Sequence, residues 1–198
     1  LTDEVVGSTA QKVYDDAQKM LEQMVAGKWI KCKGLSQIFK ANSVGDDIHI
    51  FDATSHELLY IQCTLRQQTK KTQGQANLAL SDFIAPQESG LQDYIGAFVV
   101  CSGFDIEAQL QKFEAEHNDY DAIMLKALAD RLAEAFAEYL HEQIRTTIWA
   151  YAPKEDLSNP DLIAEKYRGI RPAPGYPACP DHQEKIGIFK LLNASDKI

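Results

Sequence analysis

The 198-residue chain contains no run of about eighteen apolar residues, so the sequence predicts no membrane-spanning helix. Basic residues are also in the minority: 20 Lys and Arg stand against 29 Asp and Glu, and the formal net charge at pH 7 is −9. An acidic surface repels phosphate backbones, which argues against a nucleic acid partner. The first residues, Leu1–Glu4, lack the basic and then apolar order of a signal peptide, so we expect a cytoplasmic protein.

Motifs for metals and nucleotides are missing as well. The four cysteines form no C-x-x-C pair, so we expect structural thiols in a reducing compartment rather than a metal cluster. The segment His141–Arg145 does not match the H-E-x-x-H motif of zinc hydrolases. No G-x-G-x-x-G occurs, which excludes the common Rossmann type of nucleotide site.

Apolar periodicity predicts the secondary structure of the first part of the chain. In Ser8–Ala26, apolar residues recur at steps of three and four, which is typical of an amphipathic helix, and Gly27 would end it. Asp47–Phe51 alternates and Leu58–Cys63 is apolar, so we expect two antiparallel strands joined by a turn. The polar segment Leu65–Asn77 is expected to form a surface loop.

The middle of the chain supplies a further strand and the longest helix. The continuous apolar run Ile95–Cys101 has the length of a strand and predicts a central one. A connecting helix is expected near Glu107–His117. The next helix covers about residues 119–146, with Asn118 or Asp119 as its cap, and would be roughly 40 Å long at 1.5 Å per residue. We therefore predict an α+β fold, in which helices pack on an antiparallel or mixed twisted sheet.

The segment Arg171–Pro180 holds four of the seven prolines, so it can form neither a helix nor a central strand. Alternating prolines stiffen the loop before any ligand binds. Backbone groups at Ala173 and Gly175 could then read a planar ring such as adenine, and Tyr176 offers an aromatic face. Arg171 presents a planar fork that matches a carboxylate. From these residues alone, a small-ligand site and a rigid connecting loop both remain open.

This loop carries a resemblance to a known family. Its ten residues, R-P-A-P-G-Y-P-A-C-P, and the D-H-Q-E-K that follows resemble the signature of the activation domain of cobalamin-dependent methionine synthase. Further segments extend the resemblance along the chain: Leu65–Gln68, Ser81–Pro86, Asp93–Gly96 and Lys126–Glu142. Residues 1–198 are thus identified as one activation domain. Compared with the family, we expect it to be truncated at both ends.

The resemblance implies a site for S-adenosylmethionine (AdoMet). Arg171 would hold the methionyl carboxylate, backbone groups at Ala173 and Gly175 would meet the adenine, and Tyr176 would line the pocket. Glu134, on the long helix, would pair with the amino group of the ligand. Without the resemblance, Glu134 could equally be a solvated helix position. No residue of the chain is implied to be catalytic, and no metal site is expected.

The resemblance also implies cofactors and partners. Cobalamin would be bound by a neighbouring module, and an inactive cob(II)alamin would be remethylated with the methyl of AdoMet and an electron from flavodoxin or a flavoprotein reductase. The isolated domain would not make methionine. Asp130, Glu134 and Glu138 share a helix face, and Asp130 and Glu138 could either face a partner or be solvated.

Two other functions stay open. The chain could be a non-catalytic docking module for a cobalamin-binding module or a reductase, or a stand-alone AdoMet sensor. Asp47–Asp52 is similar to the D-x-H-x-x-G pattern of a histidine that ligates cobalamin. Asp52 replaces the closing glycine, however, and the alternation predicts a strand, so we reject this ligand.

Overall fold

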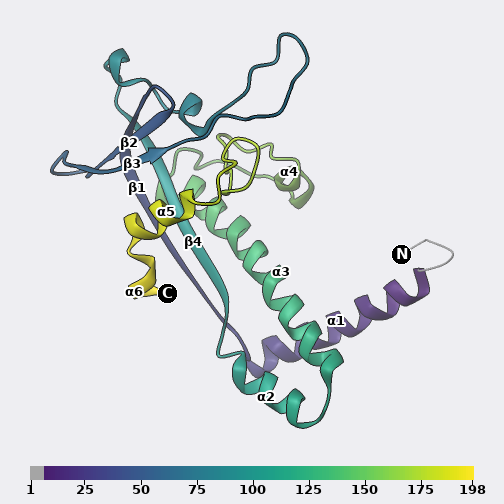
Figure 1. Cartoon of the computed structure of the whole chain (residues 1–198). Helices are drawn as coiled ribbons and strands as arrows, with labels where there is room; N and C mark the ends of the chain where they lie inside the picture. Colours follow the sequence, from purple (N-terminus) through teal and green to yellow (C-terminus); the bar gives the residue numbers. More distant parts are fainter. Residues whose placement is uncertain (1–6) are drawn as a thin grey trace. The chain divides into compact units, whose positions relative to one another are not determined.

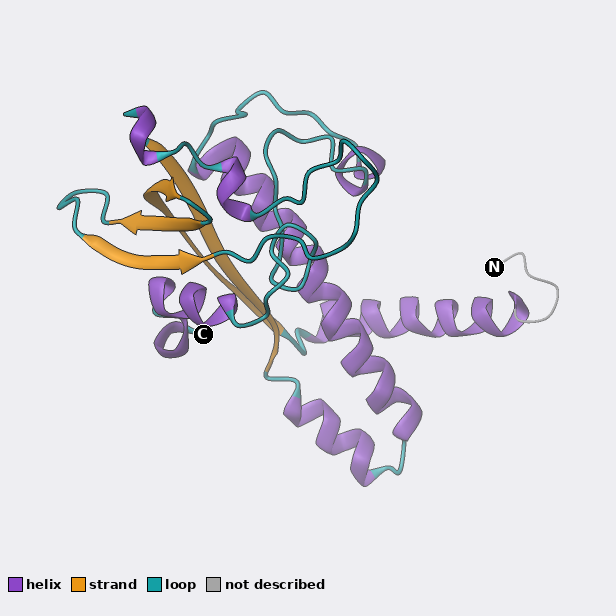
Figure 2. Ribbon diagram, turned by 45° about the horizontal axis from the view of Figure 1, so that its top comes forward, coloured by secondary structure: helices purple, strands orange, loops and turns teal. Residues whose placement is uncertain are grey.

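The computed structural model describes residues 7–198 (Figure 1 and Figure 2). The described residues form two compact units, a helical unit of residues 7–33 and 100–140 and a sheet unit of residues 34–99 and 141–198. No helix in the described part of the chain is long and apolar enough to cross a membrane. The predicted α+β class is confirmed. The helices and strands are α1 (Gly7–Gly27), β1 (Lys31–Val44), β2 (Asp47–Phe51), β3 (Leu58–Cys63), β4 (Asp93–Phe104), α2 (Glu107–Ala115), α3 (Asp119–Gln143), α4 (Asn159–Ile163), α5 (Glu184–Leu192) and α6 (Ala194–Lys197).

The sheet has the strand order β3-β2-β1-β4, and its strands are the orange arrows of Figure 2. β1 pairs antiparallel with β2, and β2 pairs antiparallel with β3, which confirms the predicted strand pair. Ile48 and Ile50 of β2 are 0% and 2% exposed, as alternation requires. They form a core with Phe39 and Ala41 of β1 and with Leu192 at the end of α5.

The prediction that Ile95–Cys101 is a central strand is wrong, because β4 stands last in the strand order, beside β1. The apolar run has another cause. Ile95, Ala97 and Val99 pack against the core of the sheet unit. On alternate positions, Phe98 stacks on His141 with ring centroids 6.3 Å apart. Side chains therefore pack on both faces of this strand, although Tyr94 and Gly96 remain exposed and one of its edges is not paired within the described sheet.

The helical unit confirms three predicted helices. α1 ends at Gly27, as expected, and Met24 near its end is 1% exposed. Met24 belongs to one core with Phe113 of α2 and Leu125 of α3. Asn118 caps α3, since its Oδ1 accepts the Asp121 backbone N–H at 3.2 Å.

α3 does not stop at Thr146. Its regular part ends at Gln143, and a π-helical turn, Ile144–Ile148, carries the helix on. This turn belongs to the sheet unit and directly precedes the segment that leads to the proline-rich loop.

Candidate functional site

The proline-rich loop contains neither helix nor strand over Arg171–Pro180, as predicted, but it is not simply extended. The Gly175 N–H donates to the Cys179 carbonyl at 2.7 Å, and the Cys179 N–H donates to the Tyr176 carbonyl at 2.9 Å. The Tyr176 N–H donates to the Ala173 carbonyl at 3.0 Å. The loop is therefore a tight turn that closes on itself, with Pro174 and Pro177 inside it and Pro172 and Pro180 on either side. The Gly175 N–H is already used inside it.

The turn presents most of the predicted ligand-binding residues at the surface. Ala173 and Gly175 are exposed, and the Tyr176 side chain is 64% exposed. Arg171 is half-buried. The structure thus brings these four residues together on one short loop.

A side chain at Gly175 would be strained and would collide with the present position of His182. The φ of Gly175 is +106°, in the region that favours glycine. A Cβ built on it would lie 2.4 Å from Cε1 and 2.8 Å from Nε2 of His182. The His182 ring therefore covers one side of the turn. It also lies near Lys185, whose Nζ is 3.3 Å from the His182 Nδ1. His182 was not among the predicted ligand residues.

A buried charged cluster precedes the loop in the chain, and it was not predicted from the sequence. Arg145 is 0% exposed, and its Nε lies 3.0 Å from both carboxylate oxygens of Glu155. Its guanidinium also lies 4.5 Å from the centroid of the Tyr167 ring and donates from Nη1 to Nδ1 of His141 at 2.6 Å. Burial, followed by the positive charges of Arg145 and Arg171, lowers the pKa of His141 to about 3. His141 is therefore neutral and accepts a hydrogen bond here.

This cluster fixes the chain that leads to the loop. The guanidinium of Arg145 ties the π-helical turn to Glu155, ten residues further on. Tyr167, four residues before Arg171, packs on the same guanidinium. The influence of Arg171 on the pKa of His141 shows that the Arg171 charge lies near the cluster.

The predicted helix residues lie in the helical unit. Glu134 is exposed, and its Oε2 accepts from Nη1 of Arg131 at 2.9 Å. Asp130 is exposed and Glu138 is half-buried. Because the loop belongs to the sheet unit and each unit is described by itself, the pairing of Glu134 with the same ligand as Arg171 stays a prediction.

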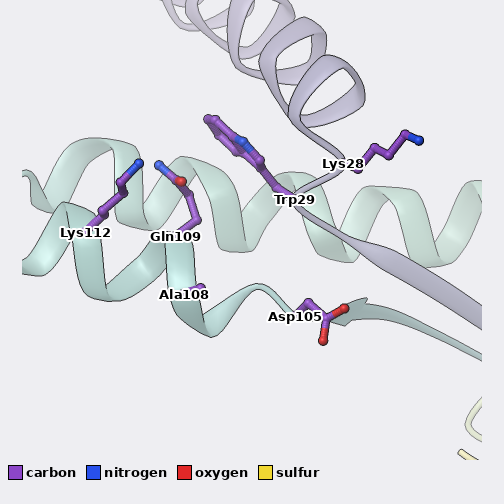
Figure 3. Close-up of a pocket in the computed structure, with 6 residues that line it drawn as sticks. All are labelled: Lys28, Trp29, Asp105, Ala108, Gln109 and Lys112. Atoms are coloured by element: carbon purple, nitrogen blue, oxygen red, sulfur yellow. The ribbon is translucent and has the colours of Figure 1, made fainter.

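A pocket of about 260 Å³ lies in the helical unit, and the sequence did not predict it. In Figure 3 the side chains of Gln109 and Lys112 rise from α2 toward the Trp29 ring, while Lys28 extends away from it. None of the predicted AdoMet residues lines this pocket. Its full lining is Lys28, Trp29, Asp105, Ala108, Gln109 and Lys112.

Comparison with known proteins agrees with the sequence of the loop. A family model described as "Vitamin B12 dependent methionine synthase, activation domain" matches residues 1–198. A solved structure described as "Crystal Structure of the MetH Reactivation Domain bound to AdoHcy" is similar, with 56% sequence identity and a TM-score of 0.86. The match covers 96% of this chain and 59% of that chain, so this chain spans less than two thirds of its length. The resemblance stated from the sequence is confirmed, and the chain belongs to the family of vitamin B12-dependent methionine synthase activation domains.

Proposed function

We propose that this chain binds AdoMet and thereby supports the reductive remethylation of cob(II)alamin within a B12-dependent methionine synthase, which makes methionine from homocysteine and methyltetrahydrofolate. The observation that carries the proposal is the exposed turn at Gly175 and Tyr176, in a chain 56% identical to a reactivation domain that is described as bound to AdoHcy. AdoHcy is AdoMet without its sulfonium methyl, so a site that holds one fits the skeleton of the other.

The contacts follow from charge and shape. AdoMet carries a carboxylate, an ammonium and a sulfonium. The guanidinium of Arg171 holds the carboxylate, and the Glu134 carboxylate pairs with the ammonium. Since the Gly175 N–H is used inside the loop, the adenine meets other backbone groups of Ala173 and Gly175. Tyr176 supplies an aromatic face against the ligand.

The role of the chain in the reaction is positioning. AdoMet would supply the methyl group and, once its carbon–sulfur bond is broken, would leave as AdoHcy. Cobalamin held by a neighbouring module would accept the methyl, with one electron from a reduced flavoprotein. The residues of this chain hold the sulfonium in place and need not transfer a proton. We propose flavodoxin or a flavoprotein reductase as the electron donor, and the cytoplasm as the location.

The acidic helix face has a place in this scheme. Asp130 is exposed and Glu138 is half-buried on α3, and we propose that they face the cobalamin-binding module or the reductase. Rim charges of this kind act mainly on the association rate and make it sensitive to salt.

Calorimetric titration with AdoMet tests the proposal. Arg171→Ala and Glu134→Gln should each weaken binding by about 1 kcal/mol or more, the scale of a charge-assisted hydrogen bond. Arg168→Ala is the matched control for the arginine, because Arg168 is exposed in the same segment. Arg131→Ala should not weaken binding, since it only releases Glu134 from its ion pair.

A docking module without a ligand is the second candidate, favoured by the exposed acidic residues of α3. It predicts no heat with AdoMet and a salt-sensitive association with a cobalamin-binding module. Wild-type protein that binds neither AdoMet nor AdoHcy at millimolar concentration would rule out the proposed function in favour of this candidate.

A further inference from the structure

A buried carboxylate lies behind the proline-rich loop. Glu184, the first residue of α5, is 6% exposed. Its Oε2 accepts two hydrogen bonds, from the Gln62 Nε2 at 2.9 Å and from the Cys179 thiol at 3.0 Å. Its other oxygen, Oε1, is buried without a hydrogen-bond partner within residues 7–198. Burying a carboxylate costs free energy, so the burial of Glu184 behind the loop requires an explanation.

Cys179 is the link between this carboxylate and the loop. Its side chain is held by Glu184, and the residue is 3% exposed. Its backbone N–H and C=O make the two hydrogen bonds that close the turn over Gly175 and Tyr176. Burial, followed by the hydrogen bond to Glu184 and its negative charge, raises the pKa of the Cys179 thiol to about 12, so the thiol keeps its proton and remains a donor.

Gln62 holds the Glu184 carboxylate from the side of strand β3. It lies on β3, is 6% exposed and pairs across the sheet with Ile48. A Cβ on Gly187 would lie 2.7 Å from the Gln62 Oε1 and 2.5 Å from the Tyr60 Cε1. Helix α5 therefore approaches β3 closely only because residue 187 is glycine. The Gln62 amide is thereby held against α5, with its Nε2 on Glu184.

We propose that Glu184 is a positioning residue for the AdoMet loop, which it ties through the Cys179 thiol to strand β3. This inference rests on the proposed function and adds a residue to it. The tie keeps the turn closed before the ligand arrives, so binding does not have to order the loop. Glu184 itself does not touch the ligand.

Paired substitutions separate the tie from general stability. Glu184→Ala and Cys179→Ala each remove the link, and AdoMet affinity should fall about ten-fold, the scale of a lost hydrogen bond to a charged group. Glu184→Gln and Cys179→Ser keep an acceptor and a donor at the same places, and should stay within about three-fold of wild type. The double variant Glu184→Ala/Cys179→Ala should bind no more weakly than either single one, because both break one link. Asp196→Asn, at an exposed carboxylate of α6, is the control.

Hydrogen exchange without ligand is the second readout. In Glu184→Ala, the Gly175 and Cys179 amides should exchange at least about ten times faster, while the Ile48 and Ile50 amides of β2 keep their protection. Unchanged exchange at Gly175 would overturn the inference, whether or not the protein binds AdoMet. Protection lost equally across β2 would also overturn it, since Glu184 would then only stabilise the sheet unit. Absence of AdoMet binding in wild type, with the exchange effect intact, would refute the proposed function but not the tie.

Discussion

Replacing Gly175 with alanine tests the geometry of the turn most directly. The backbone of Gly175 has φ +106°, and a side chain there costs about 1–3 kcal/mol in strain. The added Cβ would also lie 2.4 Å from Cε1 of His182. Because His182 is exposed, its ring can swing away, and we assign this contact about 1 kcal/mol or less. The total for Gly175→Ala is therefore about 1–4 kcal/mol.

The chain offers a matched control for the two contributions. Gly103 has φ +115°, and a Cβ built there meets nothing within 4 Å. Gly103→Ala should therefore lose stability through backbone strain alone. In the double variant Gly175→Ala/His182→Ala the collision is removed and the strain remains, so it should recover about 1 kcal/mol or less of the loss.

Both stability and ligand affinity measure the effect. Thermal unfolding reports the strain if the closed turn persists. If the turn opens instead, AdoMet affinity falls by the fraction of molecules that remain closed, about thirty-fold for 2 kcal/mol. A Gly175→Ala variant with wild-type stability and wild-type affinity would refute the reasoning. Full recovery by His182→Ala would show that backbone strain plays no part.

Three further changes address charged groups. Glu155→Gln leaves the buried Arg145 without its carboxylate and should destabilise the protein by about 3–5 kcal/mol in denaturant unfolding, whereas the same change at an exposed glutamate should cost little. The pKa of His141 is lowered to about 3 in the folded protein against an ordinary 6.5, so the unfolded chain takes up the proton first. Stability should be present above pH 6.5 and fall by up to about 1.4 kcal/mol per pH unit below it, and His141→Asn should flatten this slope relative to wild type. Arg66→Ala breaks a two-bond contact to Asp82, at 2.6 and 2.9 Å, and should cost about 1 kcal/mol, less at high salt.

The sequence was sufficient to predict an element where the residues of that element alone determine its structure. The alternation of Asp47–Phe51 sets which side chains are buried, and the structure buries Ile48 and Ile50. The side-chain oxygen of Asn118 satisfies an N–H at the start of α3, which the composition of the helix start indicates. Proline content correctly excluded helix and strand from Arg171–Pro180.

Local rules failed where the cause is a neighbour far along the chain. The apolar run Ile95–Cys101 indicates a strand covered on both faces, but not what covers it. On one face the cover comes from the end of α3 and the residue after its π-helical turn, with Tyr94 against Trp149 at 6.4 Å and Phe98 against His141. Strand β1 has no clear alternation, because many of its positions are polar and only its second half is buried.

The buried arginine shows the same limit for the site. An arginine at the end of a helix is ordinarily expected in solvent. Arg145 is buried because Glu155, His141 and Tyr167 surround it. His141 is its neighbour four residues earlier on the helix, but no spacing rule adds Glu155 and Tyr167. These residues set the path of the chain toward Arg171, so the role we propose for them in ligand binding is indirect.

The shape of the ligand loop therefore has two separate sources. The prolines remove alternatives to an irregular backbone, but they do not choose one. That choice comes from the glycine at 175, which the turn needs, and from the backbone of Cys179, which closes it. Glu184 holds Cys179 from a helix that follows the loop, and the helix lies close enough only because of Gly187. A chain that kept every proline but lost Gly175 or the Glu184 contact should therefore retain an irregular loop that binds AdoMet weakly.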